Sequence, residues 1–461
     1  MIRFFSHFMH RTSVARALVD ACVVMASVFA AVMAQSGAMG NVVPVAGTHG
    51  VSVAAGILFI NAATGFYAAK NTRTFGESLL RATLALALAL PLTYAVFSLW
   101  PYEFANRGAV QLAAMASVAA VIVHRAYVAA SASSPSRTRS RTLIFGTGEA
   151  ARVVGETLRS ADPDAEIVGY FAGPNEREPL VPLADVLPAT SSLCQTARER
   201  RVDEIVVALT ERRSGSMPLR ELLECKLLGV KVYDINSHFE KRLGQIRIDY
   251  VYAGWLIFGD GFNQGMARSV VKRLFDIVCA SVLAALTAPL MLLAALLIRL
   301  ESRGSVLYRQ QRTGMNGKPF EVIKLRSMRI DAEGDGQPRW ATAGDDRITR
   351  VGQFIRRARI DELPQLFCVL RGDMSLVGPR PERPFFVDQL TQEIPFYSVR
   401  HSVKPGVTGW AQVRYQYGST IEDSQEKLQY DLYYVKNHTL FLDIVVLLET
   451  VRVVLTGKGA R

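Results

Sequence analysis

The chain has 461 residues, of which 50% are hydrophobic, and its 53 Lys and Arg against 41 Asp and Glu give a formal charge of +12. This length excludes a single ordinary domain, and the basic excess is typical of proteins that bind nucleic acid or an anionic membrane surface. Because long apolar runs accompany the charge, we expect a membrane and no nucleic acid. The five cysteines form no Cys-x-x-Cys pair, which argues against a disulfide framework or a zinc site.

Four apolar segments open the chain and predict a transmembrane bundle over residues 1–130. Each is close to the ~20 residues that a helix needs to cross the hydrocarbon of a bilayer. Lys and Arg precede the first segment, separate the second from the third and follow the fourth, whereas the loop after the first segment has none. The positive-inside rule therefore predicts that both ends of the bundle are cytoplasmic. The four segments are 14–34, 51–69, 79–100 and 109–130.

Residues 141–235 predict a Rossmann-like module. A strand at 142–145 leads into Gly146-Thr147-Gly148-Glu149-Ala150-Ala151, a G-x-G-x-x-A loop that opens a helix. Further strands at 167–171, 204–208 and 230–233, with a helix at 219–228, continue the alternation and predict a small parallel sheet. Such a loop holds phosphates in dinucleotide-binding folds, so Gly146 and Gly148 are candidate nucleotide-loop residues. The acid that binds the ribose is absent where the second strand ends, so a structural or regulatory module and a cofactor-binding module both stay open. A connector with weak strand signals follows at 236–269.

The apolar run 274–300 is long enough to cross the membrane a fifth time. Pro289 lies inside it, where a proline removes a helical hydrogen bond and kinks the segment. Lys272 and Arg273 precede the run and Arg299 follows it, so both ends can stay at one charged interface. We predict a re-entrant helical hairpin that enters and leaves on the cytoplasmic face. A straight spanning helix is the alternative.

Two adjacent acids follow in an arginine-rich stretch that starts at Arg356. Pro364 suits the first turn of a helix, which would place Asp361 and Glu362 at the helix start, where the dipole favours anions and metal-bridged phosphates. Carboxylates for a divalent metal, next to a fixed cation such as Arg380, are what phosphoryl transfer needs. A short acidic pair alone is more often a solvated helix start, so its neighbours decide its meaning.

The acidic pair is one of six short motifs, and their order from residue 271 to the end is more specific than any one of them. The motifs are Lys272-Arg273-Leu274-Phe275-Asp276, Tyr308-Arg309-Gln310-Gln311-Arg312, Lys324-Leu325-Arg326-Ser327-Met328, Asp361-Glu362-Leu363-Pro364-Gln365, Val377-Gly378-Pro379-Arg380-Pro381 and Lys404-Pro405-Gly406-Val407-Thr408-Gly409-Trp410. Together they resemble the catalytic core of the bacterial polyprenyl-phosphate sugar-1-phosphate transferases, which are monotopic membrane enzymes. The chain departs from the usual family pattern at Gly304-Ser305, Gln311 and Leu325, none of which is a proposed catalytic group.

The resemblance implies a catalytic domain over residues 270–461 and a defined reaction, the first step of exopolysaccharide, capsule or O-antigen synthesis. A UDP-sugar, with glucose or galactose as the expected sugar, would give its sugar-1-phosphate to undecaprenyl phosphate and release UMP. Asp361 would be the nucleophile that carries the phosphosugar, and Asp361 and Glu362 would hold Mg²⁺. The other family positions expected to bind substrate phosphate or nucleotide are Arg356, Arg380, Lys324, Arg326 and Asp431.

The expected fold is thus a membrane α-helical bundle, an α/β Rossmann-like module and a monotopic α/β catalytic domain with a re-entrant helical hairpin. The expected partners are undecaprenyl phosphate, a UDP-sugar and membrane lipids at the cytoplasmic face of a bacterial inner membrane, and the sequence leaves a homodimer open. Two other functions stay open: a membrane-anchored NAD-dependent nucleotide-sugar epimerase or dehydratase, and a non-enzymatic nucleotide-sensing scaffold. The first lacks its ribose acid, and the second does not need an intact acidic pair.

Overall fold

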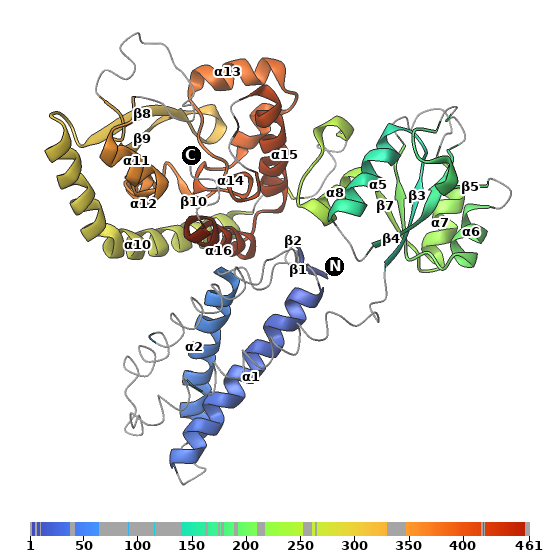
Figure 1. Ribbon diagram of the computed structural model, residues 1–461, viewed down its shortest axis with the longest axis horizontal. Helices are drawn as coiled ribbons and strands as arrows, with labels where there is room; N and C mark the ends of the chain where they lie inside the picture. The colour runs from blue at the N-terminus through green and yellow to red at the C-terminus, as the bar shows by residue number, and fades with distance from the viewer. Residues whose placement is uncertain are drawn as a thin grey trace. The chain divides into compact units, whose positions relative to one another are not determined.

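The computed structural model divides into two compact units, which are described separately (Figure 1). Unit 1 comprises Met1–Ser134, Gln264–Ser424 and His438–Arg461, and unit 2 comprises Pro135–Asn263 and Gln425–Asn437. The structure describes residues 2–4, 7–9, 11–36, 42–63, 91, 115, 140–161, 165–173, 176, 179–188, 192–209, 217–251, 261–262, 265–329, 347–415, 418 and 420–456.

Two long helices form most of the described N-terminal region. The elements here are β1 (Ile2–Phe4), β2 (His7–Met9), α1 (Arg11–Ser36) and α2 (Val42–Ala63). The two helices lie side by side (Figure 1), and Asn61 donates a hydrogen bond to buried Asp20 over 3.4 Å. The first expected span and the described part of the second are therefore helical. The spans expected at 79–100 and 109–130 lie outside the described residues.

Unit 2 is built on a five-stranded parallel sheet, which confirms the parallel sheet predicted for this region. Its elements are β3 (Ser140–Phe145), α5 (Glu149–Ala161), β4 (Ala165–Phe171), η2 (Leu183–Asp185), β5 (Val186–Leu187), α6 (Leu193–Glu199), β6 (Glu204–Val207), α7 (Leu219–Leu227), β7 (Lys231–Asp234) and α8 (Ile235–Leu243). The strand order β5-β4-β3-β6-β7 is 3-2-1-4-5 counted from the first strand, the order found in doubly wound dinucleotide-binding folds.

Helices cover both faces of this sheet (Figure 1). Along β3, Leu143 and Phe145 belong to a core shared with α6 and α7, whereas Ile144 belongs to a core shared with α5 and α8. This alternation follows from the period of two along a strand, and both faces are apolar because both are covered.

The described start of the connector after the sheet is mostly helical where weak strand signals were expected. Helix α8 continues to Leu243 and ends at Gly244 with a left-handed φ of 63°, and a 3-10 turn, η3, follows at Ile248–Tyr250. Helices often end in this way, because glycine adopts left-handed angles without a Cβ penalty. The capping side chain of Asp234 at the start of α8 and this glycine explain the helix locally.

The rest of unit 1 surrounds a β-hairpin and a two-stranded parallel pair. The hairpin joins β8 to β9, and the pair joins β10 to β11. The elements are α10 (Met266–Glu301), β8 (Leu307–Thr313), η4 (Met315–Gly317), β9 (Pro319–Leu325), α11 (Arg350–Arg357), η5 (Ile360–Glu362), α12 (Gln365–Arg371), β10 (Ser375–Val377), α13 (Pro384–Glu393), η6 (Tyr397–Ser402), β11 (Gly406–Thr408), α14 (Trp410–Arg414), α15 (Ile421–Asn437) and α16 (Leu440–Thr456). Only the start of α15, up to Ser424, belongs to unit 1.

Helix α10 is one of two described helices that are long and apolar enough to cross a membrane, the other being the Ser13–Ala31 part of α1. Its 36 residues would span about 54 Å if straight, but the helix bends in Figure 1. Pro289 lies inside it, and Thr287 Oγ1 donates a hydrogen bond to the carbonyl of Leu283 over 2.7 Å; both features bend helices. The segment expected to form a re-entrant helical hairpin kinked at Pro289 is thus one bent helix with Pro289 inside it, and its re-entry stays a prediction.

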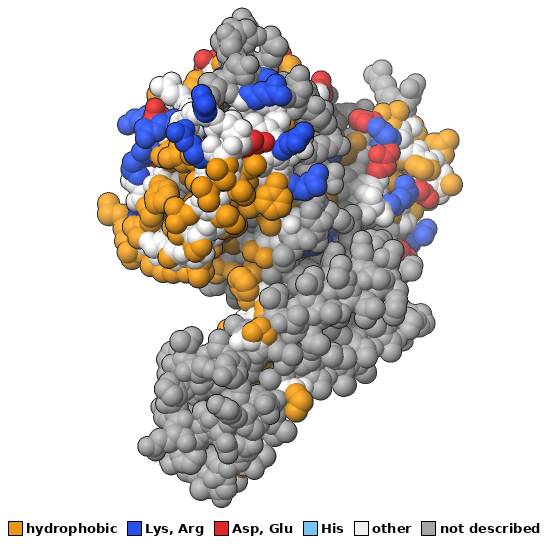
Figure 2. All heavy atoms as spheres, turned by 60° about the vertical axis from the view of Figure 1, so that its left-hand side comes forward, with side chains coloured by type: hydrophobic (Ala, Val, Ile, Leu, Met, Phe, Trp, Pro, Cys, Tyr) orange, Lys and Arg blue, Asp and Glu red, His pale blue; other side chains and the backbone are white. Residues whose placement is uncertain are grey.

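Both ends of α10 are attached to the same unit. Near its start, Arg273 donates hydrogen bonds to two carbonyls at the end of α12 over 2.6 and 2.7 Å. Near its end, Ala294 and Ile298 pack in a core with residues of β9 and α11. The leucines between these attachments, such as Leu286 and Leu290, are exposed. Figure 2 shows hydrophobic side chains gathered on this side of the molecule below a border of Lys and Arg.

Candidate active site

Asp361 and Glu362 lie in η5, a single 3-10 turn between α11 and α12. The chain enters this turn through Arg359, whose φ of 56° is left-handed and therefore strained for a residue with a side chain. Pro364 is the N-cap of α12, so the acids precede the helix by a short turn instead of forming its first turn. Strained backbone of this kind concentrates at functional sites.

Three cations surround Glu362. Its Oε1 accepts hydrogen bonds from Lys324 Nζ over 3.1 Å and from Arg380 Nη2 over 3.0 Å, and its Oε2 lies 3.7 Å from Arg359 Nη1. Burial raises the pKa of Glu362, but the three cations outweigh burial and hold the pKa far below its ordinary value. Glu362 is therefore an ionised carboxylate that fixes the cations around it.

Asp361 has different surroundings from its neighbour. Its side chain is 8% exposed and forms no hydrogen bond or ion pair with residues in the described ranges. Burial and then the negative charge of Glu362 raise the pKa of Asp361 to about 6, against the opposing effects of Lys324, Arg356 and Arg380. The group is ionised above this pH, and its lone pairs are available to an electrophile or a metal.

Close backbone packing positions Arg380. It follows β10, and the glycines of two motifs let the paired strands β10 and β11 approach. A Cβ on Gly378 would overlap the carbonyl oxygen of Lys404, and a Cβ on Gly406 would overlap the backbone nitrogen of Gly378. The carbonyl of Arg380 itself accepts a hydrogen bond from Arg400 Nη2 over 3.0 Å. The motifs that contain Gly378 and Gly406 thus fix the backbone at Arg380, whose side chain contacts Glu362.

Two of the other predicted phosphate-binding residues join this cluster. Lys324, on β9, contacts Glu362 directly. Arg356, on α11, lies close enough to Asp361 to lower the pKa of that carboxyl group. The structure therefore brings together Asp361, Glu362, Lys324, Arg356 and Arg380.

Arg326 and Asp431 are not in this cluster. Arg326 is 8% exposed, and its guanidinium donates to the carbonyls of Ser302 and Arg303 over 2.9 Å each. These carbonyls follow the last turn of α10, where the helix supplies no partner for them, so the predicted phosphate ligand is a helix-capping residue. Asp431 is buried on α15, in the part of that helix that belongs to unit 2.

The sequence did not single out Arg359 and Gln412. Arg359 stands two residues before Asp361, and its position beside the acidic pair was the available signal. Gln412 Oε1 accepts a hydrogen bond from Arg380 Nη1 over 3.2 Å, while its buried Nε2 has no partner among the described residues. The available sequence signal for Gln412 was its position two residues after Trp410, the end of the last motif.

The first family motif holds the fold together and lies outside the acidic site. Lys272 Nζ donates to Asp443 Oδ2 over 2.7 Å, and Asp443, on α16, is fully buried. Asp276 Oδ1 accepts the backbone N–H of Leu376, in β10, over 3.2 Å. The motif therefore joins α10 to β10, the strand that precedes Arg380.

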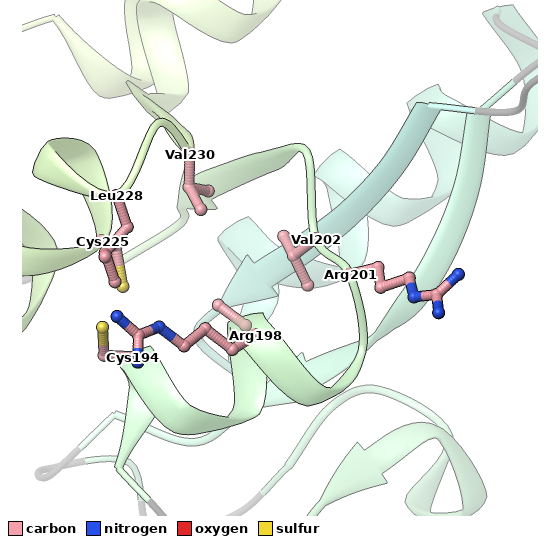
Figure 3. Close-up of a pocket in the computed structure, with 8 residues that line it drawn as sticks. Cys194, Arg198, Arg201, Val202, Cys225, Leu228 and Val230 are labelled. Atoms are coloured by element: carbon pink, nitrogen blue, oxygen red, sulfur yellow. The ribbon is translucent and has the colours of Figure 1, made fainter.

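Unit 2 holds a cavity of about 210 Å³ that is lined by residues of α6 and α7 (Figure 3). The side chains of Cys194, Cys225 and Arg198 point into it, and its lining contains no carboxylate. This cavity therefore does not offer the carboxylates that the acidic pair provides. Gly146 and Gly148 lie in the same unit, in the loop between β3 and α5.

The acidic pair could supply part of the coordination of a magnesium ion, with substrate phosphates and water supplying the rest. Mg²⁺ in phosphoryl-transfer sites is usually held by one or two carboxylates with water and substrate phosphates. Asp361 suits this role because its oxygens accept no hydrogen bond from described residues, whereas Glu362 Oε1 is shared by Lys324 and Arg380. The described residues contain no group of three His, Cys, Asp or Glu that could hold a metal alone.

Two family models match the chain: that of the bacterial sugar transferases over residues 267–457, and that of a CoA-binding domain over residues 62–233. The chain is 41% identical over 305 residues to the UDP-N-acetylgalactosamine-undecaprenyl-phosphate N-acetylgalactosaminephosphotransferase of Aeromonas hydrophila, covering 64% of this chain and 71% of that protein. It is 48% identical over 197 residues to the UDP-glucose:undecaprenyl-phosphate glucose-1-phosphate transferase of Caulobacter vibrioides, covering 42% and 73%. The acidic site and these matches together show that the chain belongs to the bacterial sugar transferase family.

Proposed function

We propose that the chain transfers a sugar-1-phosphate from a UDP-sugar to undecaprenyl phosphate and releases UMP, the initiating step of a polysaccharide. The observation that carries the proposal is the buried Asp361 carboxylate, which accepts no hydrogen bond from described residues and stands beside a carboxylate fixed by three cations. The names of the Aeromonas and Caulobacter relatives describe reactions of this class.

In the first half-reaction, an oxygen of ionised Asp361 attacks the β-phosphorus of the UDP-sugar. The bond from this phosphorus to the bridging oxygen breaks, and its electron pair leaves with UMP. The enzyme then holds the phosphosugar as an acyl phosphate. Lys324 and Arg380, fixed by Glu362, stabilise negative charge on the phosphates, and Arg356 adds positive charge near Asp361.

In the second half-reaction, a phosphate oxygen of the lipid attacks the same phosphorus. The bond to Asp361 breaks, its electron pair returns to the carboxylate, and the product carries a diphosphate between lipid and sugar. Mg²⁺, held by Asp361 and substrate phosphates with Glu362 beside them, would supply further charge neutralisation. Arg326 and Asp431 have no part in this proposal.

We place the reaction at the cytoplasmic face of a bacterial inner membrane. Both ends of α10 attach to unit 1, while its middle exposes leucines, which supports entry and exit on one side of the bilayer. The basic residues that flank the N-terminal apolar segments support the cytoplasmic side, where UDP-sugars are available. Undecaprenyl phosphate can reach the site only from the membrane, so this position also supplies the acceptor.

The sugar is proposed only as a hexose. The expectation from the sequence was glucose or galactose, and the relatives use UDP-glucose or UDP-N-acetylgalactosamine. Release of UMP should therefore be measured with undecaprenyl phosphate and a panel of these three UDP-sugars. Absence of UMP release with every member of the panel would overturn the proposed transfer.

The covalent step is tested without the lipid acceptor. Wild-type protein given a UDP-sugar with ³²P at the β position should become labelled, and the label should be stable to acid and released by hydroxylamine. Asp361→Asn should abolish the label, UMP release and transfer together. Normal turnover of wild type without any labelled enzyme would instead support direct attack by the lipid phosphate, with Asp361 as a magnesium ligand only.

A further inference from the structure

The glycine loop of unit 2 already binds an anion, and that anion is a side chain of the same chain. Glu176 Oε2 accepts hydrogen bonds from the backbone N–H of Thr147 over 2.6 Å, from Thr147 Oγ1 over 3.0 Å and from the N–H of Gly173 over 3.1 Å. Its Oε1 accepts the N–H of Gly148 over 3.1 Å. These donors include the loop amides, at the start of α5, that a dinucleotide fold offers to a pyrophosphate.

This carboxylate leaves little room for a side chain at Gly148 in the loop and at Gly173 after β4. A Cβ on Gly148 would lie 3.2 Å from Glu176 Oε1, and a Cβ on Gly173 would lie 3.3 Å from Glu176 Oε2. Both distances are tighter than ordinary van der Waals contact, so small residues are needed for the carboxylate to reach the amides. The segment after β4 is also held over the loop by a hydrogen bond of 2.8 Å from the N–H of Leu180 to the carbonyl of Thr147.

Coenzyme A does not fit a loop in this state. The family model that covers this region is that of a CoA-binding domain, and CoA carries a pyrophosphate. The carboxylate occupies the loop amides that would bind the pyrophosphate, and its negative charge would repel phosphate. The same objection applies to the pyrophosphate of NAD, and so to the epimerase alternative.

We infer that Glu176 is a built-in substitute for a ligand phosphate, and that unit 2 of this chain does not take CoA or another pyrophosphate-bearing nucleotide at its glycine loop. The loop has a structural role, because its hydrogen bonds to Glu176 connect the segment after β4 to the start of α5. This inference is independent of the transfer reaction proposed for unit 1.

The experiment compares full-length wild type in detergent with Glu176→Ala and Glu176→Gln. Glu199→Ala, which removes a carboxylate from an exposed position on α6, is the control. Hydrogen exchange of the peptide that contains Thr147 and Gly148 is measured, together with equilibrium dialysis of radiolabelled CoA. CoA is used because uridine nucleotides would also bind a UDP-sugar site.

Wild type and Glu199→Ala should show no saturable CoA binding and the same slow exchange of the loop. Glu176→Ala should exchange on the order of tenfold faster or more, because hydrogen bonds to a charged acceptor are lost. If Glu176→Ala does not fold, Glu176→Gln is used instead. It keeps the side-chain volume and tests whether the negative charge slows exchange of the loop. Saturable CoA binding to wild type, or loop exchange that neither Glu176 variant changes, would overturn the inference.

Discussion

Asp361 and Glu362 are neighbours in one turn, yet their carboxyl groups have opposite environments. The hydrogen-bonding cations, Lys324 and Arg380, reach Glu362, while Asp361 is left with burial and the charge of its neighbour. The pKa of Asp361 rises to about 6 and that of Glu362 falls. Such a separation supports the proposed division of roles, in which Asp361 takes part in the chemistry and Glu362 holds the cations in place.

The raised pKa of Asp361 predicts that this residue lowers the stability of the fold. An acid whose pKa rises from 3.8 to about 6 on folding binds more protons folded than unfolded, so its cost appears as pH rises from about 4 to 6 and is complete at pH 7.5. Asp361→Asn should therefore raise the free energy of unfolding at pH 7.5 by about 1–3 kcal/mol, and by little at pH 4.

Thermal unfolding in detergent with EDTA measures this difference. Glu362→Gln is the contrasting variant and should lower stability at pH 7.5, since its cations lose a charged partner. An Asp361→Asn protein less stable than wild type at pH 7.5 would contradict the assigned environment of the carboxyl group.

Arg380 is predicted to act through its forked geometry as well as its charge. Its Nη2 contacts Glu362 and its Nη1 contacts Gln412, and a lysine cannot make both contacts from one planar group. Arg380→Lys should lower kcat of the transfer roughly tenfold to a hundredfold. Arg357→Lys, at an exposed position on α11, should leave kcat unchanged. Equal activity of Arg380→Lys and wild type would exclude the proposed role of the fork.

At the scale of elements, α10 is both an apolar helix and a part of the catalytic fold. The residues before its bend bind the strand β10 and the helices α12 and α16, and those after it pack on β9 and α11. The start of α10 is therefore attached by polar contacts, and its end is attached by apolar packing. The acidic pair lies in sequence between α11, which packs on the end of α10, and α12, which binds the start of α10, so loosening either end should disturb it.

Lys272 is predicted to be the most sensitive of these contacts. Lys272→Ala would remove the 2.7 Å ion pair to Asp443, which is fully buried, and should lower the free energy of unfolding by about 3 kcal/mol. Replacing both partners, with Lys272→Met and Asp443→Leu, should recover much of the loss. Thermal unfolding of wild type and the two variants tests this, and a double variant as unstable as Lys272→Ala would show that the pair acts in another way.

At the scale of the whole molecule, the bend of α10 predicts membrane topology. Single cysteines at Ser269 and Arg303, in a background without the native cysteines, should both react with a membrane-impermeant reagent only from the cytoplasm. Pro289→Leu should favour a straight helix, since a proline costs about 3 kcal/mol in a regular helix interior. Labelling at position 303 from outside the cell, in the protein that keeps Pro289, would exclude re-entry.

The sequence predicted what depends on local pattern and missed what depends on distant partners. Alternating strands and helices predicted the parallel sheet, and the ordered motifs placed Lys324 and Arg380 with the acidic pair. The cap formed by Arg326 joins residues 24 positions apart, and the contact of Glu176 with Thr147 spans 29 positions. Neither contact produces a local sequence pattern. Arg326 was therefore predicted to bind phosphate, and Glu176 was not singled out.

Helix α15 has a consequence for how the protein unfolds. It is one uninterrupted helix, yet its first residues belong to unit 1, where Asp423 accepts a hydrogen bond from Tyr415, and its later residues belong to unit 2, where Asn437 donates to Glu240 over 2.7 Å. A helix melts cooperatively, so neither unit can lose its share without disturbing the other. Calorimetry should therefore show one shared endotherm for the two units, and Asn437→Ala should lower its midpoint without splitting it. Two separate endotherms in the wild-type protein would mean that the helix breaks between its halves.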